Sequence, residues 1–325
     1  MKELLQRLAE FRLGTYVIFL GLTGYFAATQ PGFLDSANLL SLARQYSELG
    51  IVAVGMTLVI ATGGIDISVG GIVGLTAMLV GVLGVTLGWN IWAAAGVGLC
   101  AAAAVGAVNG FAIAYMGVQP VLVTLATMSL TRGIAYILTS GTSLSINQPG
   151  FQAIASSDIG AAGGALPTPS VIMALVFIAA AFVLRKTVHG RYLLALGQSE
   201  QAAALSGIRV RRVKFAAYFG LALLGGLAGV LLTSRLATAF PDAGRNYEFE
   251  AITAVVLGGT SLAGGEGSLL GTLFGVATMA VLRNGLSLGG QTDVVRTQML
   301  AVALITAVVI DLWRKRMLRS LETRA

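Results

Sequence analysis

The sequence has 325 residues, of which 56% are hydrophobic and only 11% are charged, and its mean hydropathy is +0.85. A soluble domain carries about a quarter charged residues, so this composition excludes a chain that is surrounded by water on all sides. The net charge of +7 does not indicate a nucleic-acid partner, because the basic residues fall in separate blocks along the chain. We therefore predict an all-α, polytopic membrane protein.

Ten apolar runs, separated by charges and turn residues, are candidate membrane spans. They cover residues 13–29, 47–63, 67–88, 91–116, 119–140, 169–185, 213–234, 251–265, 268–287 and 296–313. Runs 47–63 and 251–265 are short, and eight spans remain if both re-enter the membrane instead of crossing it. The sequence thus predicts a single transmembrane domain over residues 1–325, with about ten helices or eight, and with short broken or re-entrant segments.

The basic blocks predict the orientation of the chain. Lysine and arginine concentrate in the N-terminal segment 1–12, around the central loop 186–212 and in the tail 314–325. Cytoplasmic segments of membrane proteins carry such an excess, so we place these three segments and both termini in the cytoplasm. Residues 141–168, which are polar and rich in glycine and proline, then form a periplasmic loop. Glu3 and Glu10 argue against a cleaved signal peptide at the start.

The sequence contains no recognisable enzyme site. None of the four lysines follows a glycine, so the chain lacks the Gly-Lys-Ser/Thr run with which a P-loop holds phosphates. The single Cys100 has no partner for a disulfide, and the single His189 lies in a basic loop without other metal ligands. We therefore predict no catalytic residue, metal site or cofactor site in this chain.

Two glycine-rich segments that each follow an apolar run resemble one another. In the alignment that we favour, Gly63 and Gly64 of the segment 62–70 correspond to Gly258 and Gly259 of the segment 257–266. Unwound backbone at membrane depth must line a cavity or be buried in protein, so paired segments of this kind indicate a transport pathway. The candidate pathway residues are Gly63, Gly64, Asp66, Ser68, Gly258, Gly259, Ser261 and Glu266. Asp66 has an alternative role as the N-cap of a half-helix, and Glu266 has one as a residue of an interface loop.

The central loop contains a segment that the sequence predicts to be helical. Ser199 is a suitable N-cap, Glu200 favours the positive end of the helix dipole, and Gly207 is a natural C-terminal stop. Such a small-residue helix either docks into another protein or is an ordinary interfacial helix. The candidate docking residues are Ser199, Glu200, Gln201, Ala202, Ala203, Ala204, Leu205, Ser206, Gly207 and Ile208. We expect arginine at both Glu200 and Ala203 to abolish transport while the chain still folds and inserts.

Three stretches resemble the ribose/xylose/galactoside-type permeases of bacterial ABC importers. They are residues 55–70, 190–208 and 247–265, in the order that the family has them. The chain departs from the usual pattern at Phe249, where leucine is common, and at Gln198 and Ser199, where Gly-Asn is common. The resemblance implies a location in the bacterial inner membrane, a second permease copy or paralogue, and a periplasmic solute-binding protein. It also implies a cytoplasmic ATPase subunit, which binds ATP and Mg²⁺ and contacts the segment at residues 199–208.

The family implies that the chain moves a monosaccharide into the cytoplasm by alternating access. Cargo within the same importer class could instead be a polyol, the furanone autoinducer-2, a nucleoside or an amino acid. An ion-coupled secondary transporter, with Asp66 and Glu266 in its pathway, is a less favoured alternative, as is a purely structural membrane subunit. Arg132 and Arg283 are further ionisable residues within predicted spans, and the sequence assigns no partner to either. No array of polar side chains typical of a sugar site stands out within these spans.

Overall fold

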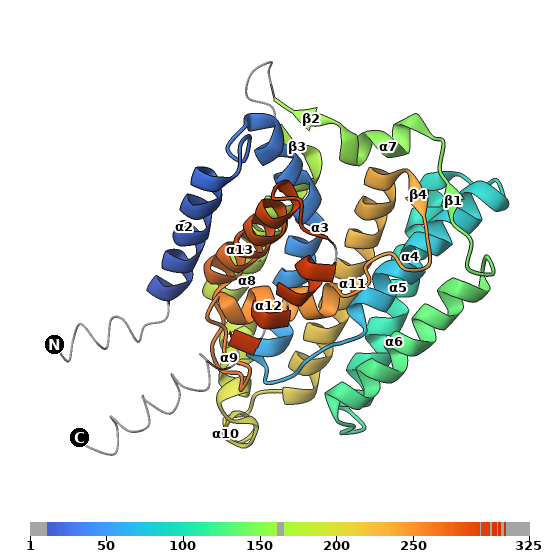
Figure 1. Cartoon of the computed structure of the whole chain (residues 1–325). Helices are drawn as coiled ribbons and strands as arrows, with labels where there is room; N and C mark the ends of the chain where they lie inside the picture. The colour runs from blue at the N-terminus through green and yellow to red at the C-terminus, as the bar shows by residue number, and fades with distance from the viewer. Residues whose placement is uncertain are drawn as a thin grey trace.

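The computed structural model describes residues 12–160, 166–292, 294–299, 301–303, 305–306 and 309. Most of these residues form helices that pack side by side in a bundle (Figure 1). The helices are α2 (Arg12–Thr29), α3 (Ser36–Ala61), α4 (Val69–Gly81) with the π-helical turn η1 (Val82–Thr86), α5 (Ile91–Ala114), α6 (Pro120–Ile137), α7 (Pro149–Ser156), α8 (Thr168–Lys186), α9 (Val188–Gln198), α10 (Glu200–Leu205), α11 (Val210–Leu236), α12 (Tyr247–Leu257) and α13 (Leu269–Leu288).

Six of the described helices are long and apolar enough to cross a membrane. They are Val69–Thr86, Ile91–Ala114, Pro120–Ile137, Thr168–Lys186, Val210–Leu236 and Leu269–Leu288, which match six of the predicted spans. Shorter apolar stretches, Gly14–Thr29 and Ser47–Ala61, correspond to two more. The last predicted span, 296–313, lies partly outside the described residues, which end at residue 309. The polytopic all-α architecture is therefore confirmed, whereas a total of ten spans is not.

Two short runs in the sequence behave differently from each other in the structure. Run 47–63 is the C-terminal part of α3, which has 26 residues, and is long enough to cross a bilayer. Run 251–265 is not a full span, because α12 has only 11 residues and ends at Leu257. A helix of that length is about 17 Å long, roughly half the thickness of the hydrocarbon core. The segment that follows α12 is a turn, because its glycines interrupt the helix.

The centre of the bundle is built from α3 and α4. Every residue of α3 from Tyr46 to Thr57 is buried, as is every residue of α4 from Val69 to Met78. A helix segment that is largely apolar on all sides packs inside a protein, and these parts of α3 and α4 do so. Glycines allow the neighbouring helices to approach closely, since a Cβ on Gly55 would lie 2.9 Å from the Cα atom of Leu221 in α11.

The described residues of the predicted periplasmic loop, 141–168, form a cap on one end of the bundle. It contains α7 and three short strands, β1 (Leu144–Ser145), β2 (Asp158–Ile159) and β3 (Leu166–Pro167). β2 pairs antiparallel with β3, and β1 pairs antiparallel with β4 (Thr238–Ala239), which follows α11. Figure 1 shows this cap at the end of the bundle opposite α10.

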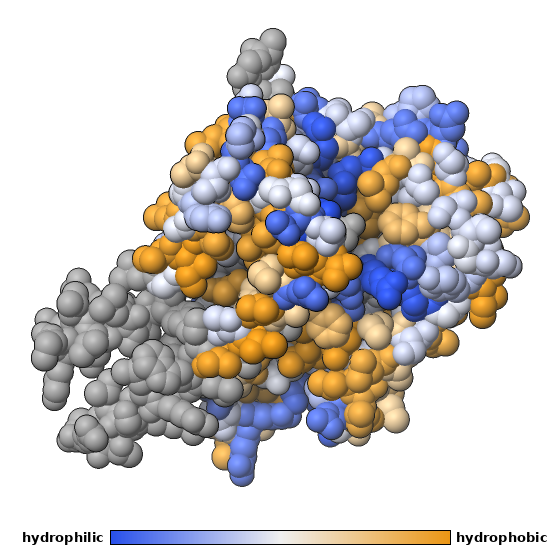
Figure 2. Space-filling model, viewed as in Figure 1, coloured by the Kyte–Doolittle hydropathy of each residue, from blue (hydrophilic) through white to orange (hydrophobic). Residues whose placement is uncertain are grey.

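The surface of the bundle separates polar ends from an apolar middle. In Figure 2 hydrophilic residues gather at the top and bottom of the molecule, and hydrophobic residues cover much of the surface between them. Large hydrophobic side chains on the candidate spans, such as Val108 (58%), Leu122 (60%) and Ile178 (65%), are exposed on the surface of the chain. A hydrophilic patch also reaches the middle of the face shown, which is unusual for a surface in contact with lipid.

Candidate functional site

The predicted loop 186–212 folds as two short helices, α9 and α10. Ser199 is the N-cap of α10, and its Oγ accepts a hydrogen bond of 3.2 Å from the backbone N–H of Ala202. Gly207, with φ of +79°, ends the segment in a Schellman motif, in which Gly207 N–H bonds Ala204 and Ile208 N–H bonds Ala203. The predicted start, helix and stop of this segment are thus confirmed, whereas its role in docking stays a prediction.

The exposed face of α10 consists of small and apolar side chains. Leu205 is 85% exposed, and Gln201 and Ala202 are exposed beside it. Ala203 is only 3% exposed and faces the rest of the chain, while Glu200 pairs with Lys214 at 2.6 Å. Arginine at position 203 would therefore disturb the fold of the segment itself. Our expectation that the Glu200 and Ala203 double variant folds normally is wrong.

The two glycine-rich segments end their helices with the same backbone motif. After α3, Gly63 N–H bonds the carbonyl of Ile60 and Gly64 N–H bonds that of Val59. After α12, Gly259 N–H bonds the carbonyl of Val256 and Thr260 N–H bonds that of Val255. Both patterns are Schellman motifs.

The left-handed residue of each motif corrects our alignment of the two segments. Gly63 has φ of +81° and Gly259 has φ of +83°. Gly63 therefore corresponds to Gly259, one position away from the pairing with Gly258 that the sequence favoured. Only a residue without a Cβ adopts this conformation at little cost, so backbone geometry, and not the count of glycines, sets the register.

The two segments meet the C-terminal end of α9 in a close backbone contact, which we call the glycine junction (residues 61–63, 197–198 and 264–265). Ala61 is the last residue of α3, and its otherwise unpaired carbonyl accepts a hydrogen bond of 3.0 Å from Gly265 N–H. A Cβ on Gly264 would lie 2.6 Å from Gly63 N and 3.0 Å from the carbonyl oxygen of Gly197. The junction thus joins three segments that are far apart in the sequence.

Asp66 and Ser68 lie between α3 and α4, and both are completely buried. Oδ1 of Asp66 accepts hydrogen bonds from the backbone N–H of Ser68 at 2.7 Å and from its hydroxyl at 2.6 Å. Asn109 on α5 donates to the same hydroxyl at 2.9 Å. Asp66 therefore forms a turn that positions the start of α4, close to its predicted role as a cap, although Ser68 is the N-cap residue. No hydrogen-bond partner of its Oδ2 lies among the described residues.

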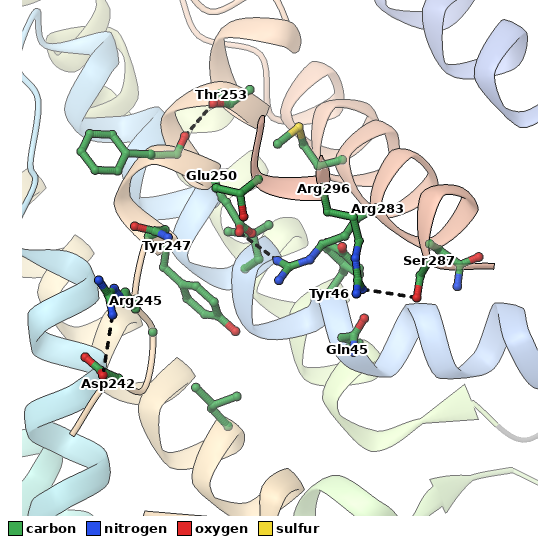
Figure 3. A pocket seen from close by; sticks show the side chains of 18 of the residues that line it. Gln45, Tyr46, Asp242, Arg245, Tyr247, Glu250, Thr253, Arg283, Ser287 and Arg296 are labelled. Atoms are coloured by element: carbon green, nitrogen blue, oxygen red, sulfur yellow. Dashed lines mark hydrogen bonds and ion pairs between the residues drawn. The ribbon is translucent and has the colours of Figure 1, made fainter. Parts of the chain in front are cut away.

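A cavity of about 660 Å³ lies toward the opposite end of α3 and α12. Such a volume falls within the range of about 300–1,000 Å³ that is usual for small-molecule sites. Its wall combines aromatic, amide and charged side chains from α3, α11, α12 and α13 (Figure 3). From these helices they include Gln45, Tyr46, Arg235, Tyr247, Phe249, Glu250, Arg283 and Asn284, and the segments between and after the helices add Phe240, Asn246 and Arg296.

Two ion pairs contribute to this cavity, and their exposure differs. Arg283 of α13 donates to Glu250 of α12 at 2.9 Å, and the two side chains are 40% and 11% exposed. Arg235 of α11 donates to Glu48 of α3 at 2.8 Å, but the Glu48 side chain is 0% exposed. Figure 3 shows Arg283 and Glu250 reaching toward each other from neighbouring helices. A ligand in the cavity can therefore reach the first pair, whereas Glu48 lies behind the wall.

Comparison with known proteins identifies the family. Residues 38–310 match the family of permease components of branched-chain amino acid transport systems. The chain belongs to this family of ABC importer permeases. It is 41% identical to the ribose import permease RbsC of Escherichia coli over 300 residues, which are 91% of this chain and 92% of that protein. No solved structure matches the chain significantly.

Two further relatives align over nearly their whole length. The ribose import permease RbsC of Bacillus subtilis is 40% identical over 310 residues, which are 94% of this permease and 93% of that protein. The L-arabinose ABC transporter permease AraH of Azospirillum brasilense is 33% identical over 311 residues, 96% of this permease and 90% of that protein. The similarity therefore extends over nearly the whole of each permease and is not confined to one motif.

The residues that the sequence singled out in this permease do not line the cavity. Among the described residues, the cavity wall contains none of Gly63, Gly64, Asp66, Ser68, Gly258, Gly259, Ser261 and Glu266. Ser261 is buried and accepts from Ala263 N–H at 3.2 Å, while Glu266 is exposed in the turn before α13. Sequence reasoning noted Arg283 as an ionisable residue within a span, but it missed Tyr46, Tyr247 and Arg235 as neighbours. Only the fold brings these side chains of four helices together.

Proposed function

We propose that this chain is the transmembrane permease subunit of an ATP-driven importer, and that its cargo is a monosaccharide. The relatives named for ribose and L-arabinose support a monosaccharide, because they match over nearly the whole chain. The observation that carries the proposal is the cavity of about 660 Å³, which offers aromatic faces and hydrogen-bonding groups together. Small polar ligands are held by a few convergent polar groups in a pre-formed, partly apolar pocket.

Within the cavity, Tyr46 and Tyr247 provide flat apolar faces for a sugar ring, and Glu250 and Arg283 provide an acceptor and donors for its hydroxyl groups. The ion pair keeps both groups oriented before the cargo arrives. An amino acid is the alternative cargo in keeping with the name of the family, since the same pair could contact an ammonium and a carboxylate group.

The fold suggests how motion of a partner ATPase would reach the cavity. Going back along the chain, α10 is preceded by α9, which ends near Gly197 in the glycine junction. The junction also contains the end of α3 and residues 264–265 of the turn that follows α12. Tyr46 lies fifteen residues before Ala61 on α3, about 22 Å along that helix, and Tyr247 begins α12. Rigid displacement of α9 would therefore be carried along both helices to the cavity walls, as alternating access requires.

We further propose the partners and the orientation of the subunit. A cytoplasmic ATPase, which binds ATP and Mg²⁺, contacts α10, and a periplasmic solute-binding protein docks on the cap at 141–168. A second permease, identical or a paralogue, completes the pathway. Both termini are cytoplasmic, the protein is in the bacterial inner membrane, and the chain itself catalyses no reaction. The motif residues shape the pathway indirectly, through the glycine junction and the start of α4. They are Gly63, Gly64, Asp66, Ser68, Gly258, Gly259, Ser261 and Glu266.

The energy source is tested by uptake into proteoliposomes that contain the permease, its ATPase and its solute-binding protein. Uptake should require ATP inside the vesicles and the binding protein outside, and should persist when sodium and proton gradients are removed. Uptake driven by an ion gradient without ATP would contradict the proposal and would point to Asp66 and Glu266 as coupling residues.

The docking role of α10 is tested by Leu205→Glu. Because Leu205 is 85% exposed, we expect the variant to fold and insert normally while ATP-dependent uptake falls by more than tenfold. The ATPase subunit should also fail to co-purify with the variant. Leu205→Met, which keeps the apolar surface, is the matched control and should retain uptake. Normal uptake by the glutamate variant at equal expression would show that α10 is not the docking segment.

A further inference from the structure

A second, smaller cavity of about 370 Å³ lies beside α10, at the end of the bundle opposite the cap. Its wall comes from the end of α5, from α10 and from the first residues of α11. The lining consists of Tyr115, Ala204, Ile208, Arg209, Val210, Arg211 and Arg212. We call it the arginine groove. It combines an apolar floor with three exposed guanidinium groups.

The positive charge of the arginine groove is not neutralised within the described part of the chain, where no carboxylate pairs with Arg209, Arg211 or Arg212. Glu200 is the single acidic residue between 188 and 214, and it pairs with Lys214. Arg209 is the N-cap of α11, and Arg211 and Arg212 lie in its first turn, where the positive end of the helix dipole also favours an anion. The groove is therefore suited to a group with at least one negative charge.

A row of exposed and partly exposed aromatic side chains continues from the groove along the surface of α5 and α11. Phe111 stacks on Tyr115 with ring centres 5.4 Å apart, Tyr115 meets Phe215 edge to face at 6.4 Å, and Phe215 stacks on Phe219 at 5.8 Å. Phe111 is 54% exposed and Tyr115 is 42% exposed. Gly110 makes this row possible, because a Cβ on it would lie 3.1 Å from the backbone carbonyl oxygen of Phe215 and would push α5 away from α11. A charged groove thus adjoins an apolar strip on a membrane-spanning surface.

We propose that the arginine groove binds the headgroup of an anionic phospholipid, whose acyl chain lies along the aromatic row. A phosphate diester fits the fork of an arginine side chain, and basic pockets between transmembrane helices bind such headgroups. The groove is continuous with partly exposed aromatic rings, and this favours a lipid over a soluble anion. A soluble anion has no acyl chain that could pack on these rings. Ala204 and Ile208 belong to the groove and to the α10 segment, so a bound lipid would stabilise that segment in the position that the ATPase meets.

The proposal is tested by native mass spectrometry of the detergent-purified permease during titration with phosphatidylglycerol or phosphatidylcholine. We expect one phosphatidylglycerol per chain to bind at least tenfold more tightly than phosphatidylcholine. The triple variant, which combines Arg209→Gln, Arg211→Gln and Arg212→Gln, should lose this preference. Each single substitution should weaken the preference severalfold. Arg185→Gln with Lys186→Gln is the matched control, because it removes charge from the same basic segment outside the groove, and it should leave the preference unchanged.

A second measurement follows transport in vesicles of phosphatidylcholine alone or with one quarter phosphatidylglycerol. ATP-dependent uptake by the complex should rise severalfold with phosphatidylglycerol for the natural sequence and not for the triple variant. Equal binding of both lipids, or a phosphatidylglycerol preference that survives the triple substitution, would overturn the proposal. The proposal would also be overturned if the triple variant no longer bound the ATPase or a second permease copy while its lipid binding was unchanged. The groove would then be a protein interface.

Discussion

Replacing Gly197 with leucine is expected to reduce ATP-dependent uptake by more than tenfold. A Cβ at this position would overlap the carbonyl oxygen of Ala61 and the backbone nitrogen of Gly265, which bond each other across the glycine junction. Both atoms belong to the backbone, so a side-chain rotation cannot relieve the overlap. The three segments would have to separate, at a cost of about 3 kcal/mol or more. Movement of α10 and α9 would then no longer reach α3 and α12.

The control for this variant is Gly220→Leu in α11, because nothing lies within 4 Å of a Cβ on Gly220. Uptake, ATP hydrolysis by the complex and the melting temperature are measured for both variants. We expect Gly197→Leu to hydrolyse ATP without transport, or to melt at a lower temperature, while Gly220→Leu behaves like the natural sequence. Normal uptake by Gly197→Leu at normal stability would show that the junction does not transmit the motion.

The two ion pairs of the large cavity should respond in opposite ways to loss of their arginine. Arg235→Gln leaves Glu48, which is 0% exposed, as a buried charge without its partner. Breaking such a pair costs about 3–5 kcal/mol, so the melting temperature in detergent should fall by more than about 5 °C. Arg283→Gln leaves Glu250, whose side chain is 11% exposed and borders the cavity, so we expect a smaller loss of stability of about 1–2 kcal/mol. This variant should instead lose uptake by more than tenfold, because the missing guanidinium lines the cavity that we propose for the cargo.

Double variants separate these two effects. Glu48→Gln with Arg235→Gln removes both charges, and we expect it to melt at a higher temperature than Arg235→Gln alone. Glu250→Gln with Arg283→Gln should remain stable but should not regain uptake, because the cargo still lacks its charged partners. Recovery of uptake in this second double variant would show that the pair has a structural role and does not bind cargo.

Local features of the fold were largely predictable from the sequence. The start of α10 at Ser199 and its stop at Gly207 follow from capping preferences, which act within one or two turns. The half-length of α12 was less clear, because residues 251–265 are apolar enough for a span but contain the left-handed Gly259. Hydropathy alone also predicted too short a helix for α3, because the N-terminal part of this helix includes polar residues that lie at the cavity.

The site was less predictable, because it depends on contacts between distant segments. The repeated glycine segments were visible as a pair, but their contact with Gly197 depends on the path of α9. Tyr46, Arg235 and Tyr247 carry no local pattern that marks them as neighbours, and each alone is an ordinary residue of a helix or helix end. Tertiary packing of four helices creates the cavity, and a single sequence contains no direct record of that packing.

The central claim is that the cavity carries a monosaccharide through the membrane under the control of a partner ATPase. The most direct test is ATP-dependent uptake by the reconstituted complex of radiolabelled ribose, arabinose and xylose, each in competition with polyols, nucleosides and branched-chain amino acids. We predict saturable uptake of at least one of these sugars, abolished by Arg283→Gln and not inhibited by leucine. Uptake of leucine, with no competition from any sugar, would contradict the claim.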